Sequence, residues 1–475
     1  MRKGMSSRQK RISHSAVAAT PKRNHSATDH IVKRDSKVNS SLWVSAEGNS
    51  TFGEISFSNS CDVAIIGGGF SGLWSAYHLI TNDPTLDIAI FEAEEIGFGA
   101  SGRNGGWASS DYPVYKSTLI KRHGAEKTEL LFRSLTSSID EIGEFARAHA
   151  PESGFVKSGT LTFARNEAQL QRLRKLEDES HRLLSAHEVL TQINIKGVLG
   201  GLFNDQCATI QPYNLLIALA RYLVGRGVRI HTKAFATRTK DGLLVNSSFV
   251  KAPYVIQATE VFGEPGRDFI PLYSLMVATE PLSGDIWREI GNEPRFTFAE
   301  GSHIINYAQR TFDDRLAIGG RGATYPFGSR LDTRKESVAS VHQRLRVMAR
   351  HWFPILHDVR FTHSWGGAVA ITRDWEPYLI WNRNEGFGKI GGYAGDGVTM
   401  SYLASKTLVA EILESVSPLR NLHFINRKMK KWEPEPLRYL GVNSLVKLSA
   451  IADQEEVLTG RPSVVNRFIA PLILR

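Results

Sequence analysis

Three glycines in one short stretch, Gly67, Gly69 and Gly72, form a G-x-G-x-x-G pattern that can bind the diphosphate of a dinucleotide. In such a loop the first glycine makes the tight turn, and the second lets the backbone approach the phosphates. The third allows the following helix to pack closely, and the first N–H groups of that helix face the phosphate charge. Phe70 and Ser71 lie within the loop, so we expect them to contact the same ligand.

The segments around this loop match the elements that such a site requires. Residues 63–66 are apolar and mostly β-branched, which predicts a buried parallel strand. Apolar residues at helical spacing then continue to Asn-Asp-Pro at 82–84, which predicts the end of a helix. A second apolar strand is predicted at 88–91 and leads to Glu92, twenty residues after Gly72. A carboxylate there would accept hydrogen bonds from the adenosine ribose, so the whole series predicts dinucleotide binding.

A second glycine-rich stretch follows, with five glycines in residues 97–107. Its backbone can lie against a flat ring system, and its polar side chains offer hydrogen-bond donors, which favours a flavin as the ligand. A flexible surface connection is the alternative interpretation. The candidate contacts in and before this stretch are Ala93, Ala100, Ser101, Arg103, Asn104, Gly105 and Gly106.

A third candidate segment lies near the C-terminal end of the chain. Residues 389–392 are predicted to end a strand, and apolar residues between 404 and 413 recur at helical spacing. A helix beginning near residue 398 would direct its first N–H groups and its positive dipole end at any ligand that lies there. An ordinary glycine-rich turn is the alternative. The candidate contacts are Gly395, Asp396, Gly397, Val398, Thr399 and Met400.

With these motifs in place, the chain resembles the D-amino-acid-oxidase-type (DAO) superfamily of FAD-dependent oxidoreductases. The resemblance is carried by residues 91–93 and 99–106, and within the superfamily it is to the γ-glutamylputrescine-oxidase-like branch. Residues 254–260, with Ala258 and Thr259, are similar to the strand that closes the FAD domain of the family. Residues 391–400 are similar to its C-terminal flavin-binding segment, and the likeness covers about residues 42–460.

The resemblance implies an α/β fold, with a Rossmann-type FAD-binding domain of the GR2/DAO kind and an α+β substrate domain built on an antiparallel sheet. A backbone group near Ala236 would bind the adenine. The implied ranges are 55–150, 205–268 and 355–425 for a discontinuous FAD-binding domain, 151–204 and 269–354 for the substrate domain, and 426–475 for a C-terminal helical extension.

Direct sequence patterns support several of these elements. Residues 213–224 predict an amphipathic helix, and the alternating stretches 159–163 and 275–279 predict antiparallel strands. Charges at helical spacing in 167–185 predict a solvent-exposed helix face. Residues 432–475 look helical and amphipathic, and we expect them to pack against the body of the protein, with a membrane contact as the alternative.

The expected chemistry is the oxidation of a C–N bond in a small amine or amino-acid-like substrate, by hydride transfer to flavin N5. This reaction needs no obligate catalytic base, so no catalytic residue is assigned. An arginine could bind a substrate carboxylate, and an acidic or aromatic side chain could bind an amine. The substrate-contact candidates are His303, Tyr307, Arg310, Arg321, Trp365, Arg373, Asp374 and Trp375, although buried tryptophans and Arg/Asp pairs are more often structural.

The two cysteines bear on the mode of flavin attachment. Some relatives attach FAD through a cysteine shortly before the C-terminal motif, but residues 362–370 contain none. Neither Cys61 nor Cys207 lies in the matching place. We therefore expect noncovalent FAD and, because the spacing of the cysteines is not that of metal ligands, no metal site.

Composition limits the partners of the protein. The 475 residues carry a net charge of +10, but ten of the 58 Lys and Arg and only two of the 48 Asp and Glu lie in residues 1–40. The rest of the chain is therefore nearly neutral, and we expect no nucleic-acid partner. The basic tail is interpreted as disordered, with a targeting peptide or an electrostatic anchor as alternatives. A cytoplasmic location without a transmembrane segment is expected.

Two other functions remain open from the sequence. Glu92 would also suit an NAD-dependent dehydrogenase, although residues 97–106 and 395–397 would then be unexplained. A non-catalytic flavin-binding protein that uses its basic tail to hold a partner is the other alternative. The sequence does not distinguish O2 from another electron acceptor.

Overall fold

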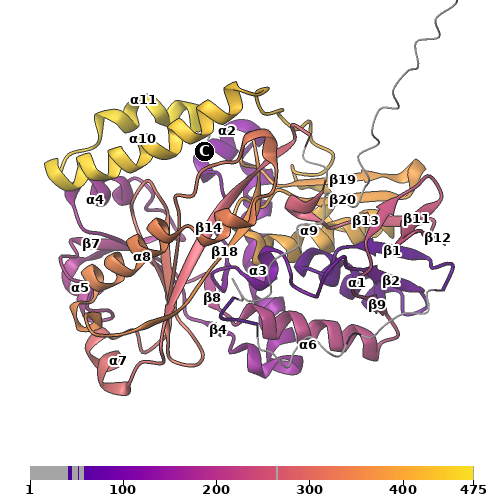
Figure 1. Ribbon diagram of the computed structural model, residues 1–475, viewed down its shortest axis with the longest axis horizontal. Coiled ribbons are helices and arrows are strands. Elements are labelled where there is room, and N and C mark those ends of the chain that lie inside the picture. Colours follow the sequence, from indigo (N-terminus) through magenta and orange to yellow (C-terminus); the bar gives the residue numbers. More distant parts are fainter. Residues whose placement is uncertain (1–40, 45–51, 53–57, 264–265, 474–475) are drawn as a thin grey trace, which may run out of the picture. The chain divides into compact units, whose positions relative to one another are not determined.

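The computed structural model describes residues 41–44, 52, 58–263 and 266–473, and Figure 1 shows their arrangement. The basic tail predicted for residues 1–40 lies outside the described residues. The described residues all fall within one compact unit of the chain, residues 35–475.

A six-stranded sheet carries the first glycine motif. Its strand order is β19-β20-β13-β1-β2-β9, and all pairs are parallel except β19 with β20. The strands are β1 (Val63–Ile66), β2 (Ile88–Phe91), β9 (Arg229–His231), β13 (Tyr254–Gln257), β19 (Tyr378–Asn382) and β20 (Phe387–Gly391). Both strands predicted around the glycine motif are confirmed, because their runs of apolar side chains are buried on both faces of the sheet.

Five helices belong to the part of the protein around this sheet. They are α1 (Phe70–Asn82), α2 (Lys116–His123), α3 (Ala125–His149), α6 (Pro212–Gly225) and α9 (Gly397–Ile412). α1 contacts both α6 and α9, and the apolar face of α3 closes the same core. The helices predicted after the glycine motif, at 213–224 and near residue 398 are thereby confirmed.

Two three-stranded sheets lie beside the main one. One contains β10 (Ala236–Arg238), β11 (Gly242–Val245) and β12 (Ser248–Lys251), joined as antiparallel hairpins. The other contains β3 (Trp107–Ser109), β8 (Cys207–Thr209) and β4 (Val156–Lys157). β3 continues the glycine-rich stretch of residues 97–107, so that loop is anchored at its C-terminal end.

An eight-stranded sheet forms the second layer of the protein, in the order β18-β14-β17-β16-β15-β5-β7-β6. Its strands are β5 (Thr160–Ala164), β6 (Arg182–Ser185), β7 (Gly200–Asn204), β14 (Phe269–Thr279), β15 (Thr297–Glu300), β16 (Asn306–Arg310), β17 (Leu316–Arg321) and β18 (Phe361–Thr372). The pairs are antiparallel except β5 with β15, which agrees with the expected antiparallel substrate domain. Residues 361–372, which form β18, are predicted from the sequence to lie in the FAD-binding domain. In the structure β18 pairs along its length with β14 and so belongs to the eight-stranded sheet.

Four other helices lie around the eight-stranded sheet, namely α4 (Glu167–Arg174), α5 (Ala186–Leu190), α7 (Gly284–Ile290) and α8 (Ala339–Trp352). Short 3-10 turns occur along the chain at Ala100–Gly102, Pro151–Ser153, Glu260–Phe262, Phe327–Ser329, Thr333–Ser337, Pro354–Leu356, Arg383–Glu385 and Pro418–Asn421. The prediction of a helix over 167–185 was wrong in its length, because α4 ends at Arg174 and residues 182–185 form β6. Pairing of β6 with β7 supplies the backbone hydrogen bonds there.

Two helices end the chain, α10 (Leu437–Thr459) and α11 (Val464–Ile473). They run along one side of the eight-stranded sheet as a hairpin, shown in yellow in Figure 1. Within the described part of the chain, no helix is both long enough and apolar enough to cross a membrane.

Candidate cofactor and substrate site

The glycine turn after β1 is packed so closely that side chains are excluded. Gly67 has a φ of +110°, and a Cβ there would lie 2.6 Å from the carbonyl oxygen of Ala258. A Cβ at Gly72 would lie 2.0 Å from the carbonyl oxygen of Gly67. The turn, the first turn of α1 and the end of β13 therefore form one rigid support.

The first residues of α1 connect two separate candidate segments. Gly69 is the N-cap of α1 and provides no side-chain cap. The backbone N–H of Phe70 donates to Ser101 Oγ at 3.0 Å, and Ser71 Oγ hydrogen-bonds to the hydroxyl of Tyr393 at 2.8 Å. The N-terminus of α1 thus meets both the 97–107 loop and the turn before α9, which places the three predicted flavin segments around one site.

Glu92 lies at the end of β2 beside the glycine loop. Its carboxylate accepts from the backbone N–H of Gly68 at 2.6 Å and of Glu94 at 2.9 Å. Burial raises the pKa of Glu92, while these N–H donors oppose the rise. The backbone of Glu92 also pairs with His231 and Ala234, so the chain leading to Ala236 runs next to this carboxylate. The structure thus brings Glu92 and the chain before Ala236 together, and their roles toward the ribose and the adenine remain predictions.

The polar side chains of the 97–107 loop mainly hold the loop itself. Asn104 donates to the carbonyl of Ser101 at 2.6 Å and accepts from the N–H of Gly106 at 2.8 Å. Arg103 donates to the carbonyls of Phe98 and Gly366, at 3.2 and 3.1 Å. In the structure, Arg103 and Asn104 therefore hold the loop in shape. That they donate hydrogen bonds directly to a flavin remains a prediction from the sequence.

The buried carboxylate of Glu260 accepts hydrogen bonds from the turn before α9. Its carboxylate accepts from the N–H of Gly392 at 2.8 Å and also from the N–H groups of Ala370 and Tyr393. Burial raises the pKa of Glu260 to about 7. This carboxylate joins the end of β13, strand β18 and the C-terminal motif. Sequence reasoning quoted Glu260 only as the end of a motif, because nothing local signals contacts with residues more than a hundred positions away.

We expect Glu260→Gln to change how stability depends on pH. The folded-state pKa of Glu260, about 7, exceeds its ordinary 4.5, so the folded wild type loses stability as pH rises from about 4.5 through about 7. The variant should lack this loss. The difference in unfolding free energy between variant and wild type should therefore shift by about 2–3 kcal/mol in favour of the variant between pH 5 and pH 8. Urea unfolding of both proteins at the two pH values measures the shift.

Glu280→Gln is the control for this experiment. The pKa of Glu280 is lowered below 4.5, chiefly by hydrogen bonds from Arg360, so this group is ionised in both the folded and the unfolded protein across most of the window, and its removal should leave the pH dependence between pH 5 and pH 8 nearly unchanged. A Glu260→Gln profile parallel to the wild type would contradict a raised pKa at Glu260.

Two buried polar atoms at the site have no hydrogen-bond partner among the described residues. They are Thr399 Oγ1 in the first turn of α9 and Trp107 Nε1 at the end of the glycine-rich loop. A buried polar atom without a partner is costly, and such atoms are often satisfied by a bound ligand. Together with the glycine cradle and Glu92, they fit a large polar cofactor such as FAD.

The candidate substrate contacts fall into two groups, those near the predicted flavin-binding segments and those with structural contacts. Tyr307 and Arg321 belong to the first group. Tyr307 on β16 packs against Gly105, where a Cβ would lie 2.5 Å from its ring, and its hydroxyl hydrogen-bonds to Ser274 Oγ at 2.9 Å. Arg321 at the end of β17 donates to the carbonyl of Ala394 at 2.5 Å. Burial raises the pKa of Tyr307, and the charges of Arg321 and Asp396 both act on its hydroxyl.

Two tryptophans border the same region. The ring of Trp375 lies 5.3 Å from the Arg321 guanidinium, and Trp107 meets Tyr307 edge to face at 5.8 Å. Trp107 was quoted in the sequence as the end of the glycine-rich loop but not as a substrate contact. Its position on β3 becomes relevant only because β16 approaches that loop.

The other candidates make structural contacts, which for Trp365 are to the glycine-rich loop and for the rest lie elsewhere. Trp365 is fully buried and donates to the carbonyl of Arg103, and Asp374 is paired with Arg427. Arg373 pairs with Glu433, and Arg310 pairs with Asp314. His303 hydrogen-bonds to Glu456 of α10. These contacts occupy side chains whose type alone suggested ligand binding.

Groups of histidine and carboxylate side chains occur twice in the described part of the chain. They are His123, Glu376 and His423, and His303, Asp453 and Glu456. Burial raises the pKa of Glu376, but hydrogen bonds from His423 and Arg122 outweigh it and lower this pKa to about 2. Each group is thus an ion-paired cluster that includes an arginine, Arg122 or Arg172. The expectation of no metal remains a prediction.

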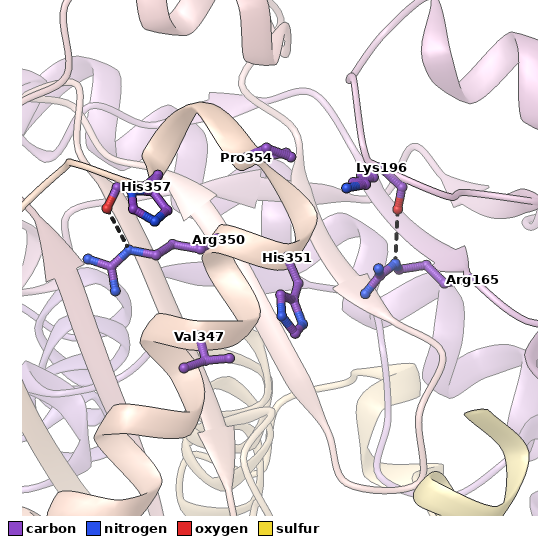
Figure 2. Close-up of a pocket in the computed structure, with 7 residues that line it drawn as sticks. All are labelled: Arg165, Lys196, Val347, Arg350, His351, Pro354 and His357. Atoms are coloured by element: carbon purple, nitrogen blue, oxygen red, sulfur yellow. Dashed lines mark hydrogen bonds between the residues drawn. The ribbon is translucent and has the colours of Figure 1, made fainter. Parts of the chain in front are cut away.

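The cysteines and a surface pocket lie outside the cofactor site. Burial raises the pKa of the Cys61 thiol to about 11 and that of the Cys207 thiol to about 12, so neither is a reactive thiolate. The pocket in Figure 2 is lined by Arg165, Lys196, Val347, Arg350, His351, Pro354 and His357. Arg165 and Arg350 donate to backbone carbonyls of Lys196 and His357, and none of the cofactor candidates lines the pocket.

Comparison with known proteins agrees with this geometry. The family described as "FAD dependent oxidoreductase" (DAO) matches residues 62–411. The chain is 28% identical to the γ-glutamylputrescine oxidoreductase of Escherichia coli K12, over 78% of this chain and 87% of that protein. It is 27% identical to the probable oxidoreductase OrdL of Haemophilus influenzae, over 74% and 83%.

Solved structures share the fold. Glycine oxidase from Geobacillus kaustophilus superimposes with a TM-score of 0.65 at 18% identity, covering 78% of this chain and all of that one. L-proline dehydrogenase from P. horikoshii superimposes with a TM-score of 0.61 at 17% identity, covering 78% and 98%. At this identity the likeness establishes the fold only.

Proposed function

Because this chain belongs to the DAO family of FAD-dependent oxidoreductases, we propose that it oxidises the C–N bond of a small amine or amino-acid-like substrate. The observation that carries the proposal is the position of Arg321, which bonds to the turn before α9 and whose charge acts on Tyr307. A charged group at this place can orient a small polar substrate against the flavin segments. The relatives named for γ-glutamylputrescine and glycine support this substrate class.

The chain would hold FAD along one line of contacts. Glu92 and the backbone near Ala236 would bind the adenosine end, and the glycine loop with the N-terminus of α1 would bind the diphosphate. The 97–107 loop and the first turn of α9, with Thr399 Oγ1, would contact the ring system. When bound, FAD accepts a hydride at N5 from the carbon beside the substrate nitrogen.

The side chains of this protein would bind and orient the substrate. Arg321 would bind a substrate carboxylate, and the negative charge of Asp396 would attract a positively charged amine. Tyr307, with its pKa raised by burial, would stay protonated and donate a hydrogen bond from its hydroxyl. Trp107 and Trp375 would exclude water from the apolar part of the substrate. No catalytic base is required among them.

An absorption spectrum with anaerobic substrate addition tests this function. The purified protein should show flavin bands near ~450 nm, and at least one amine or amino acid should bleach them without oxygen. The flavin should pass into the supernatant when the protein is precipitated with acid, because we propose noncovalent binding. Reoxidation by O2 or by an artificial acceptor then identifies the acceptor class.

The alternatives give different results. A protein with flavin bands that no amine or amino acid bleaches would keep the cofactor but contradict amine oxidation. It would support the non-catalytic flavin-binding alternative. A colourless protein that takes up NAD and not FAD would support an NAD-dependent dehydrogenase instead.

A further inference from the structure

The C-terminal hairpin presents an unusual number of apolar side chains to solvent. Leu458 is 85% exposed, Phe468 is 74% exposed and Leu472 is 54% exposed. The exposed apolar residues of the hairpin are Leu437, Tyr439, Leu440, Ile451, Val457, Leu458, Val464, Phe468 and Leu472. Scattered single residues need no explanation, but this many on two adjacent helices mark an interaction surface.

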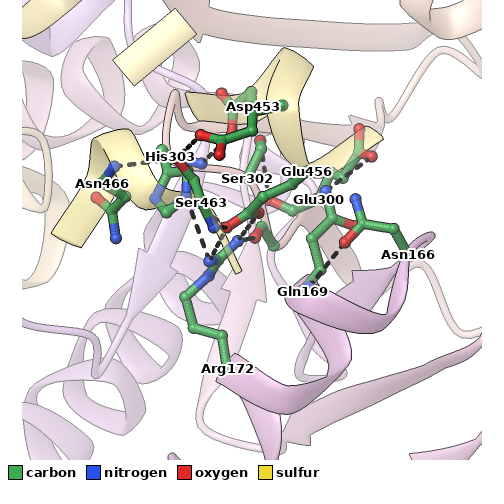
Figure 3. Close-up of polar contacts among 12 residues, drawn as sticks. Asn166, Gln169, Arg172, Glu300, Ser302, His303, Asp453, Glu456, Ser463 and Asn466 are labelled. Carbon is green, nitrogen blue, oxygen red and sulfur yellow. Dashed lines mark hydrogen bonds and ion pairs between the residues drawn. The ribbon is translucent and has the colours of Figure 1, made fainter. Parts of the chain in front are cut away.

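The opposite side of the hairpin is fastened to the eight-stranded layer (Figure 3). Arg172 on α4 donates two hydrogen bonds to the carboxylate of Glu456, at 3.0 and 2.9 Å, and His303 donates to the same carboxylate at 2.9 Å. Asp453 accepts from the backbone N–H groups of His303 and Ile304. The orientation of the hairpin is therefore set, and its apolar face points away from the body.

The acidic side chains of the hairpin make contacts within the protein, whereas three of its four basic side chains are exposed, Arg438 being buried against Glu435. Asp453 and Glu456 bind the body of the protein, and Glu455 accepts from Ser463 and from the first N–H groups of α11. All three acidic residues of 437–473 are thus engaged in contacts within the protein. The exposed charges of the hairpin are therefore mainly basic, since Lys447, Arg461 and Arg467 are exposed and the one partly exposed carboxylate, Glu455, is bonded within the hairpin.

We propose that the outer face of α10 and α11 docks on the surface of an anionic lipid bilayer. A helix with exposed Phe and Leu side chains and flanking Arg and Lys lies in the interface plane, where apolar groups enter the acyl boundary and cations meet lipid phosphates. A second copy of this chain is disfavoured as the occupant, because a two-fold interface would bring the basic faces together. Such a contact spans no membrane, consistent with the described helices.

The hairpin also lies outside the part of the chain that the family match covers, which ends at residue 411. The cofactor cradle is complete without it, since its last contact is in the first turn of α9. The docking surface is therefore separate from the proposed oxidation of amines, and each can fail without the other.

Vesicle co-sedimentation with the full-length, flavin-containing protein tests the proposal. We expect binding to vesicles of equal parts phosphatidylcholine and phosphatidylglycerol, and at least about tenfold weaker binding to phosphatidylcholine alone. Added salt should weaken binding to the anionic vesicles. The double variant Phe468→Ser/Leu472→Ser should lower binding at least about tenfold, because it removes two exposed apolar groups.

A matched control removes the same residue types elsewhere. Phe249 and Leu244 are 49% and 42% exposed and face each other across β12 and β11. Phe249→Ser/Leu244→Ser should leave vesicle binding unchanged. Arg461→Gln/Arg467→Gln should lower binding to anionic vesicles only. Flavin absorbance and melting temperature should be unchanged in the Phe468→Ser/Leu472→Ser variant, which shows that the fold is intact.

Two results would overturn the proposal. If Phe468→Ser/Leu472→Ser binds anionic vesicles as the wild type does, the binding belongs to another part of the chain, such as the ten basic residues of 1–40. If the wild type is a dimer by analytical ultracentrifugation and the double variant is a monomer, the surface is an interface between copies of this chain.

Discussion

Gly72→Ala is expected to give a protein that purifies without flavin. The added Cβ would lie 2.0 Å from the carbonyl oxygen of Gly67, and this neighbour is backbone in a turn that is itself packed against Ala258. Relief of the clash must move the first turn of α1 away from β1, which deforms the diphosphate site. We expect about 3 kcal/mol of lost stability and less than about a tenth of the wild-type flavin content. The ratio of visible to ultraviolet absorbance measures the flavin content.

Gly441→Ala is the control, because Gly441 is also a helical glycine but a Cβ there meets no atom within 4 Å. It should keep full flavin content and gain up to about 1 kcal/mol of stability, since alanine restricts the unfolded chain and favours a helix. Normal flavin content in Gly72→Ala would contradict the role of this turn in cofactor binding.

Arg321→Met is expected to keep FAD but lower kcat/KM at least about a hundredfold, or roughly 2.7 kcal/mol of transition-state stabilisation. Methionine keeps much of the side-chain length and removes the charge that would bind a substrate carboxylate. The loss should appear mainly in KM for carboxylate-bearing substrates and much less for the corresponding simple amines. Steady-state kinetics on such matched substrate pairs measures both parameters.

Arg310→Met provides the matched control. Arg310 lies on β16, three residues from Tyr307, but pairs with Asp314 away from the flavin segments. This variant should keep wild-type kinetics. Equal losses in the two variants would indicate a general effect on the eight-stranded sheet. Equal losses of Arg321→Met on amines and carboxylate-bearing substrates would contradict a carboxylate contact at Arg321.

The cofactor half of the site could be predicted from the sequence because its signals are local. The strand at 63–66, the turn at Gly67 and the acid at Glu92 occur within about thirty residues, and each residue type is required by backbone geometry or charge at its own position. The same holds for the turn and helix around residue 397, where the helix N-terminus is part of the motif. The helix over 167–185 was predicted too long, because pairing of β6 with β7 overrode a helical charge pattern.

The substrate half could not be selected in this way. Eight side chains were suitable by type, and only the pairing of β14, β16 and β17 placed Tyr307, Ser274 and Arg321 together beside the flavin segments. His303 lies only four residues before Tyr307, yet α10 from the far end of the chain engages it. Glu260 joins Gly392 through a contact across 132 positions.

The sequence by itself therefore determined the family, the cofactor and the strand, turn and helix elements of the glycine motif, whose residues are predicted to hold the cofactor. Those features depend on short runs of residues whose conformations are required locally. Only the tertiary structure decided which polar side chains are available to a substrate, and which face of the C-terminal hairpin is exposed. These depend on non-local strand pairing and on ion pairs such as Arg172 with Glu456, which form only when distant segments pack together.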